Sequence, residues 1–598
     1  MERNAWILGF SSRRLAVSGA FFLLIATLTF LAIRITADGN LVSALSGRAQ
    51  RYLIVNHRYV NSVSALWCSC LIGLIAIAFF GSSVLTEGDF FQVVYERASP
   101  IVYWGTFATI QGWLALVVGQ PSEMRAKFSA DRGILLKNLV LILLVIAAIV
   151  QWAILFFRLK LFTEIPNWYW LFQPKSGLRI WPMIPLLLGS LLVTSLTLRS
   201  SISLWPKALM LTVLGYSLQV GFGYMEGEGL DALRARYVEG GRPIYSWIVT
   251  DRNFTMISLT EYEKVYGSDY FLGRRPPGYL LAHAVTNLVA NSNSLAGSQE
   301  DRFDRLTKLM ARIYPLIAVA VVPVMIASGT YLFVNRDSIA PSLMYLFFPN
   351  FILMTLQLDQ VLFPMLFMVG LYLTLRVVGR ESSSLTIIQG AYLFIAVYFS
   401  FTLLPLLAIV PVFTMLTFIS HRRKEWARRF GRTAMGWALG FGASYLGFRL
   451  IAGYDLASRL VNGFALHGGK AGFPSGLQGT LHAIALDTAE IAIWIGFPIV
   501  ILLLIQAFAS ITAMFRKSQS KIDLLMVAVL LTLPLIARFT PAGGEVARVG
   551  LFFMPVVSFF VVKSLASLMP ESNLPVYSFV CYQLISVRLI LQNQFPWQ

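Results

Sequence analysis

Long apolar runs recur along the whole chain, with short polar segments between them. A transmembrane helix needs about 20 mostly apolar residues to cross the hydrocarbon core. Runs of this kind occupy residues 15–36, 64–85, 134–157, 180–198, 207–225, 312–334, 341–356, 360–378, 385–420, 432–453, 484–513, 522–539 and 548–568. The run at 385–420 is long enough to cross twice, with Pro405 near its turn. The pattern predicts an all-α, polytopic transmembrane bundle with about 12 to 15 spans.

Composition and charge agree with a membrane protein. Of the 598 residues, 57% are apolar and 13% are charged, which excludes an ordinary water-soluble core. The net charge of +19 is concentrated in short segments between spans, such as "HRRKEWARRFGR" at 421–432 and "FRKSQSK" at 515–521. Such segments are typical of cytoplasmic loops, so we expect a lipid bilayer and no nucleic acid as partner.

The same rule places residues 226–275, 454–483 and 540–548 on the far side of the membrane. Between residues 276 and 378 the charge rule and the apolar runs disagree by one crossing. Either 279–291 or 341–356 is then a re-entrant segment, and the sequence leaves this open.

The cysteines offer no framework for a site. Cys68, Cys70 and Cys581 lie in or beside apolar runs, which supports neither a disulfide framework nor a four-ligand zinc site. We interpret all three as small buried hydrophobic residues.

The longest polar interval, 226–275, follows the span that ends near residue 225. It begins within "GYMEGEGLDALRARYVEGG", residues 223–241, and it is much longer than a usual connection. Glu226, Glu228 and Asp231 are expected at the membrane surface, where Arg234 suits a lipid phosphate. A purely structural alternative is that these acids are solvated and pair with Arg234 and Arg236.

The interval closes with "YFLGRRPPGYLLAH", residues 270–283. Arg274 and Arg275 precede two prolines, and proline is well suited to the start of the helix that follows. Paired arginines at this position can hold phosphate oxygens in forked hydrogen bonds. They could equally bind lipid head groups in general.

At this point the chain resembles the GT-C superfamily of integral membrane glycosyltransferases. The acidic loop start and "RRPPGY" are followed by "FPNFILMTLQLDQVLFPMLF" at 348–367, where Asp359 is the matching acid. The segment "RFTPAGGEVARVGLFFMP" at 538–555 is similar to a Gly-Glu-x-x-Arg motif of bacterial members and contains Glu545 and Arg548. The resemblance covers about residues 205–570 and does not extend to the first 200 residues.

The resemblance implies a domain organisation as well as a fold. Residues 201–570 would form a GT-C-like core with external loops 226–275 and 454–483. Residues 1–200 would be an N-terminal transmembrane segment to which the sequence assigns no role. Residues 571–598 would be a C-terminal segment.

The resemblance further implies transfer of a sugar from a polyprenyl-phosphate carrier to an unidentified acceptor on the external face. Asp231 would be the general base, with Glu228 and Asp359 supporting it, and Arg275 and Arg548 would stabilise the leaving phosphate. The remaining expected substrate-binding residues are Glu226, Arg234, Arg274, Tyr279, His467 and Glu545. The expected location is a bacterial inner membrane, with the site facing the periplasm or exterior.

Several alternatives stay open at the sequence level. No cofactor is certain, and a divalent metal ion is neither required nor excluded, because no close carboxylate–histidine cluster is visible. A second acidic loop at 85–100, with Glu87 and Asp89, competes with the first. A lipid or solute transporter that uses Asp359 and Asp487 is one rival function. A non-catalytic subunit of an envelope assembly is the other.

Overall fold

The computed structural model divides the chain into two units, Met1–Ala153 and Ile154–Gln598. It describes residues 132–593 apart from gaps at 159–174, 176, 200, 228, 241–242, 255–260, 268, 270–271, 274, 293–296, 334–337, 355–357, 381, 422–424, 472–475, 517, 540–545 and 570–572. In the first unit the described residues belong to one helix, α7 (Arg132–Phe157), which runs on into the second unit.

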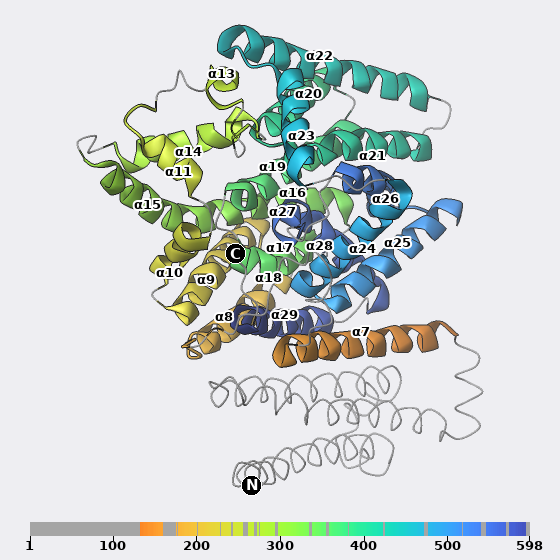
Figure 1. The fold of residues 1–598 in the computed structure, drawn as a ribbon. Helices are drawn as coiled ribbons and strands as arrows, with labels where there is room; N and C mark the ends of the chain where they lie inside the picture. The colour runs from red at the N-terminus through yellow and green to blue at the C-terminus, as the bar shows by residue number, and fades with distance from the viewer. Residues whose placement is uncertain are drawn as a thin grey trace, which may run out of the picture. The chain divides into compact units, whose positions relative to one another are not determined.

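The second unit is helical throughout its described part, with no strand there (Figure 1). Its N-terminal half contains α8 (Met183–Leu198), α9 (Leu204–Glu226), α10 (Leu230–Ala235), the π-helical turn η1 (Arg236–Gly240), α11 (Ile244–Thr250), α13 (Tyr262–Tyr266), α14 (Pro277–Ala290), α15 (Gln299–Val319), α16 (Val321–Leu332), α17 (Ala340–Leu346), α18 (Pro349–Met354) and α19 (Leu358–Gly379). Its C-terminal half contains α20 (Ser383–Phe399), η3 (Phe401–Leu403), α21 (Pro405–His421), α22 (Trp426–Ala452), α23 (Leu456–Ala471), α24 (Gly476–Ile495), α25 (Phe497–Arg516), α26 (Lys521–Phe539), α27 (Val546–Val549), η4 (Gly550–Phe553), α28 (Met554–Leu568) and α29 (Leu574–Asn593).

Seven helical segments in the described part are long and apolar enough to cross a membrane. They are Leu204–Glu226, Gln299–Leu332, Gln360–Gly379, Phe401–Ser420, Phe497–Arg516, Val546–Leu568 and Leu574–Asn593. The last of these lies in the C-terminal segment, for which the apolar pattern predicted no span. An all-α bundle with apolar helices of membrane-spanning length is therefore what the described residues form.

Close helix packing through small residues is clearest between α20 and α22. A Cβ atom added at Gly440 of α22 would lie 1.9 Å from the carbonyl oxygen of Ile387, and one at Gly390 of α20 would lie 2.3 Å from that of Trp437. Gly436 and Gly440 lie four positions apart on α22, and small residues at this spacing allow such contact between membrane helices. The buried Gln389 adds polar bonds, accepting from Trp437 Nε1 at 2.8 Å and donating to Thr374 Oγ1 at 2.7 Å.

Several apolar runs are divided differently from the sequence prediction. The run 341–356 forms two short buried helices, α17 and α18, and the run 484–513 breaks at Gly496, which has a φ of +115°. The run 385–420 divides at residues 400–404, next to Pro405 as expected. The interval 454–483, expected as an external loop, consists mainly of α23 and the start of α24.

Candidate functional site

The short helix α18 and the start of α19 lie where the predicted motifs meet. All six residues of α18 are buried, and it packs against α9, α24, α27 and α29. It belongs to the motif that the sequence reading singled out at 348–367, and the next helix, α19, contains Asp359 in its first turn. The second half of the apolar run 341–356 is thus a short helix enclosed by other parts of the protein.

The first contact with α18 comes from the start of the long polar interval. Arg236 Nε donates to Glu226 Oε2 at 2.5 Å, and both side chains are buried, with 5% and 4% exposed. Arg236 Nη1 also donates to the carbonyl oxygen of Leu353 in α18 at 3.4 Å. Lys175 Nζ lies 3.4 Å from Glu226 Oε1. Two cations therefore surround one buried carboxylate beside α18.

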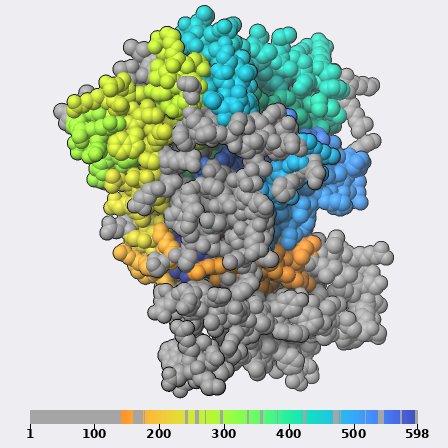
Figure 2. Space-filling model, in the orientation of Figure 1, coloured from red at the N-terminus to blue at the C-terminus, as the bar shows by residue number. Residues whose placement is uncertain are grey.

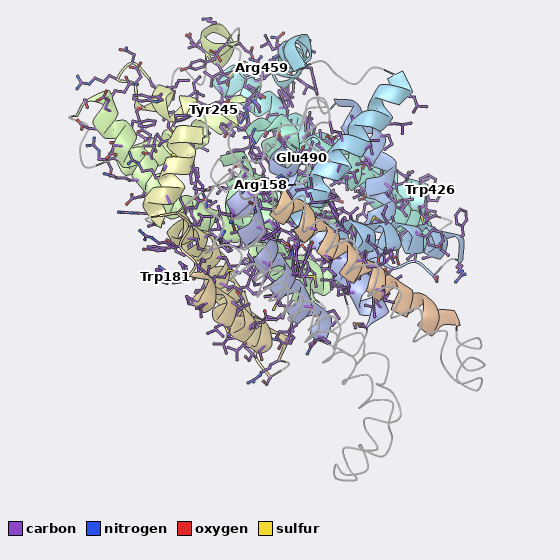
Figure 3. All side chains as sticks on the ribbon, turned by 60° about the horizontal axis from the view of Figure 1, so that its bottom comes forward. Arg158, Trp181, Tyr245, Trp426, Arg459 and Glu490 are labelled. Atoms are coloured by element: carbon purple, nitrogen blue, oxygen red, sulfur yellow. The ribbon has the colours of Figure 1, made fainter. Side chains whose placement is uncertain are left out.

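The second contact comes from the motif at 538–555. Asn350 of α18 donates through Nδ2 to the carbonyl oxygen of Ala547 at 3.1 Å. The backbone N–H of Ala547 donates to Glu490 Oε1 at 2.7 Å, and Glu490 is fully buried in α24. Side chains of two helices thus bind both polar groups of Ala547, directly before the half-buried Arg548. Figure 3 labels Glu490 among the helices near the middle of the view.

The third contact is with α19 and comes from the "RRPPGY" motif at the start of α14. Tyr279 is buried and meets Phe363 of α19 edge-on, with 6.2 Å between ring centroids. Arg275 lies over the ring of Tyr279 at 4.6 Å and over that of Tyr245 at 5.6 Å. These distances suit cation–π attraction. Because Phe363 follows Asp359 by one helical turn, the motif is joined to the part of α19 that contains this acid.

Just before this motif, hydrogen bonds define the turn at Leu272. Tyr262 Oη donates to the carbonyl oxygen of Leu272 at 2.9 Å, and Leu272 N donates to Asp269 Oδ1 at 2.7 Å. Burial raises the pKa of the Tyr262 hydroxyl well above its usual value, which favours the protonated, donating form. Arg275 N in turn donates to the carbonyl oxygen of Leu272 at 2.9 Å.

The predicted general base occupies a different environment from the other predicted residues of its segment. Asp231 is exposed in the first turn of α10, and no hydrogen bond or ion pair joins it to another described residue. Arg234, three residues later, binds Asp304 Oδ1 at 2.5 Å and Thr307 Oγ1 at 3.0 Å on α15. The structure thus ties Glu226 and Arg234 into protein contacts and leaves Asp231 accessible.

Other predicted positions are only partly described. Asp359 and His467 lie in α19 and α23, and their side chains are outside the described part. Glu228, Arg274 and Glu545 are outside the described residues, as is the rival pair Glu87 and Asp89. Within the described part, no three His, Cys, Asp or Glu side chains gather as metal ligands.

The sequence prediction gave Asn350 and Arg459 no role at the site, and it named Arg236 only beside Arg234, as a partner for the nearby acids or for a phosphate. In the sequence, Arg236 and Arg459 resemble ordinary surface cations, and only their burial in the structure distinguishes them. Asn350 carried a usable signal, because an amide within an apolar run must find a hydrogen-bond partner when buried.

No family model, curated protein or solved structure matches the chain. The geometry of its own residues therefore carries the functional argument.

Proposed function

We propose that the chain is an integral membrane glycosyltransferase of GT-C type. It would transfer a sugar from a polyprenyl-phosphate carrier to an acceptor on the external side of the membrane. The observation that carries this proposal is the convergence on α18 and the start of α19. Arg236 contacts α18 from the polar interval, Asn350 binds Ala547 beside Arg548, and Tyr279 beside Arg275 contacts α19.

The chemistry requires cations near a phosphate that gains charge as it leaves. Arg275 is half-buried and lies over two tyrosine rings, so its guanidinium is already held in position before the reaction begins. Arg548 follows Ala547, whose peptide is bound on both sides. Preorganised donors of this kind stabilise developing charge without reorganisation. Arg275 and Arg548 are accordingly assigned to the leaving phosphate.

The reaction also requires a base that can reach an acceptor from outside. Asp231 is assigned this role because it is exposed and makes no ion pair with a described residue. Glu226 is less suited, since its carboxylate is buried against Arg236 and Lys175. Glu228 and Asp359 are retained as supporting acids.

The test compares membranes that contain the wild type, Asp231→Asn or Asp251→Asn. Asp251 is a matched control, because it is another exposed acid of the same interval. Each preparation receives labelled polyprenyl-phosphate sugars, and label is followed into acceptor fractions. Removal of an oriented base costs about 10² to 10⁴ in rate, so only Asp231→Asn should lose at least a hundredfold. Equal transfer by Asp231→Asn and the wild type would remove Asp231 from the mechanism.

A transporter is the second candidate, and Asp487 of α24 favours it. The Oδ1 atom of Asp487 is buried and has no hydrogen-bond partner in the described part of the chain. Acids in apolar helices are costly and often couple transport to ions or protons. If the wild type transfers no sugar but moves a polyprenyl-phosphate sugar across proteoliposome membranes, and Asp487→Asn abolishes this movement, the transporter reading replaces the enzyme.

A further inference from the structure

Arg459 of α23 makes an unusual contact with the polar interval almost two hundred residues earlier in the chain. Its side chain is fully buried, and Nη1 lies 3.1 Å from Glu263 Oε2. Its Nη2 donates to the carbonyl oxygen of Gly273. In Figure 2 the surfaces of the polar interval and of α23 adjoin at the top of the view, and Figure 3 labels Arg459 and Tyr245 toward the same end. The contact joins two segments that the charge rule assigns to one side of the membrane.

Gly273 lies inside the turn that leads to Arg275. Its N–H donates to the carbonyl oxygen of Asp269 at 2.8 Å, and Arg275 N closes the next bond at Leu272. A Cβ atom at Gly273 would lie 2.4 Å from the Asp269 oxygen and 2.9 Å from Leu466 Cδ1 on α23. The turn is therefore packed directly against α23, and the guanidinium of Arg459 binds its central carbonyl.

The contact is poorly explained as a stabilising ion pair alone. A fully buried arginine is costly unless all of its donors are satisfied. Arg459 Nε and Glu263 Oε1 are both buried and have no hydrogen-bond partner among the described residues. An apolar residue in place of Arg459 would avoid this cost but could not bind the Gly273 carbonyl. What Arg459 supplies is a geometric link between α23 and the turn.

We propose that Arg459 is a positioning residue that holds the Gly273 turn and thereby places Arg275 for phosphate binding. The placement of Arg275 is local, because only Arg274 separates it from Gly273 and its guanidinium must lie over Tyr245 and Tyr279. This inference rests on the proposed function for the role of Arg275. It adds that α23, which is distant in sequence, controls how strongly the site holds a lipid phosphate.

The test uses the full-length protein in lipid nanodiscs, with undecaprenyl phosphate as the titrated ligand. The variants are Arg275→Gln, Arg459→Gln, Arg459→Lys and the double variant Arg275→Gln/Arg459→Gln. Arg449→Gln is the control, because Arg449 is an exposed arginine on the neighbouring helix α22. Hydrogen exchange of residues 261–276 is measured in parallel, and exchange in α29 serves as the folding control.

Arg275→Gln and Arg459→Gln should each weaken binding at least tenfold, and Arg449→Gln should leave it unchanged. The affinity of Arg459→Lys should lie between those of the wild type and Arg459→Gln, because one ammonium group cannot reproduce the contacts of the guanidinium with both Glu263 and the Gly273 carbonyl. The double variant should bind no more weakly than Arg275→Gln, because Arg459 acts through Arg275. Exchange of the backbone amides of residues 272–275 should accelerate in both Arg459 variants while α29 remains protected.

The possible failures are distinguishable. Normal binding by Arg459→Gln, with weak binding by Arg275→Gln, would overturn the positioning role and leave the proposed function intact. Additive losses in the double variant would also overturn it. Normal binding by Arg275→Gln would instead refute the phosphate role of Arg275. Unchanged exchange of the amides of residues 272–275 in the Arg459 variants would refute the proposal that Arg459 holds the turn. If Arg459→Gln does not fold, Arg459→Lys and Glu263→Gln take its place, and their phosphate affinity and amide exchange are compared with those of the wild type and Arg275→Gln.

Discussion

The buried pair between Glu226 and Arg236 should respond asymmetrically to removal of either partner. Glu226→Gln leaves the charge of Arg236 buried, with the Leu353 carbonyl at 3.4 Å as its other bonded group. An uncompensated buried charge costs about 3–5 kcal/mol. Arg236→Met leaves Glu226 beside Lys175 at 3.4 Å. Because one ion pair survives, we expect a smaller loss in unfolding free energy, of about 1–3 kcal/mol.

The double variant Glu226→Gln/Arg236→Met provides the decisive comparison. It removes both buried charges, and Lys175, whose side chain is 36% exposed, can turn toward water. The double variant should therefore be no less stable than Glu226→Gln alone. The resulting coupling free energy should fall within the range of about 0.5–3 kcal/mol that is typical of contacting residues.

Unfolding of the purified protein in mixed lipid–detergent micelles, titrated with SDS and followed by tryptophan fluorescence, measures these differences. Glu261→Gln is the matched control, because Glu261 pairs with Lys264 on the surface and such pairs contribute at most about 1 kcal/mol. If Glu226→Gln is as stable as this control, the predicted cost of leaving the Arg236 charge buried and uncompensated is refuted. So would a double variant whose loss equals the sum of the single losses.

Three further variants test other contacts. Gly440→Ala should lower the unfolding free energy strongly, because its new methyl group would lie 1.9 Å from a carbonyl oxygen. Gly442→Ala should not lower it, because a methyl group there meets nothing within 4 Å, and SDS unfolding of both variants makes the comparison. Glu490→Ala should cost about 1–3 kcal/mol by removing the acceptor of the buried Ala547 N–H, and Glu490→Gln less, as measured by the same titration. Burial acts to raise the pKa of Asp455, but hydrogen bonds from the first amides of α23 lower it below its usual value. The stability that ionised Asp455 contributes should thus be fully present above about pH 3.9, the usual pKa of an aspartate, and be lost as the pH falls through the lower pKa of the folded state. The free energy of unfolding, measured against pH, should show this loss in the wild type. Asp455→Asn should lack it.

How far the sequence predicts this structure depends on the range of the interaction. Apolar length and local breakers such as Pro405 predict helices and their ends well, because both act within a few residues. The run 341–356 was long enough for a span, yet it breaks before Pro349 into α17 and α18. What decides the outcome there is burial on all sides by other helices, which no local pattern reports.

The contacts of the candidate site lie further beyond sequence reasoning. The bond from Asn350 to Ala547 joins residues 197 positions apart, and that from Arg459 to Glu263 joins residues 196 apart. Residue types suggested that Glu226 and Arg234 bind substrate, because an acid and an arginine near a membrane suit a phosphate. The structural alternative named Arg236 as a partner for the acids, and the structure shows it bound to Glu226. The partner of Arg234 is Asp304, which no pattern in the sequence indicated.

The position of α18 links these features to the membrane. A helix of six residues leaves its terminal backbone groups without partners inside the helix. Such groups are tolerated at membrane depth only where protein surrounds them. Arg236 binds the Leu353 carbonyl, and Asn350 accepts from the N–H of Phe351 through Oδ1 at 3.0 Å. The groups that join the motifs to α18 are thus also groups that make this short helix possible, so substitutions there should alter stability and phosphate binding together, whereas Asp231→Asn should alter transfer alone.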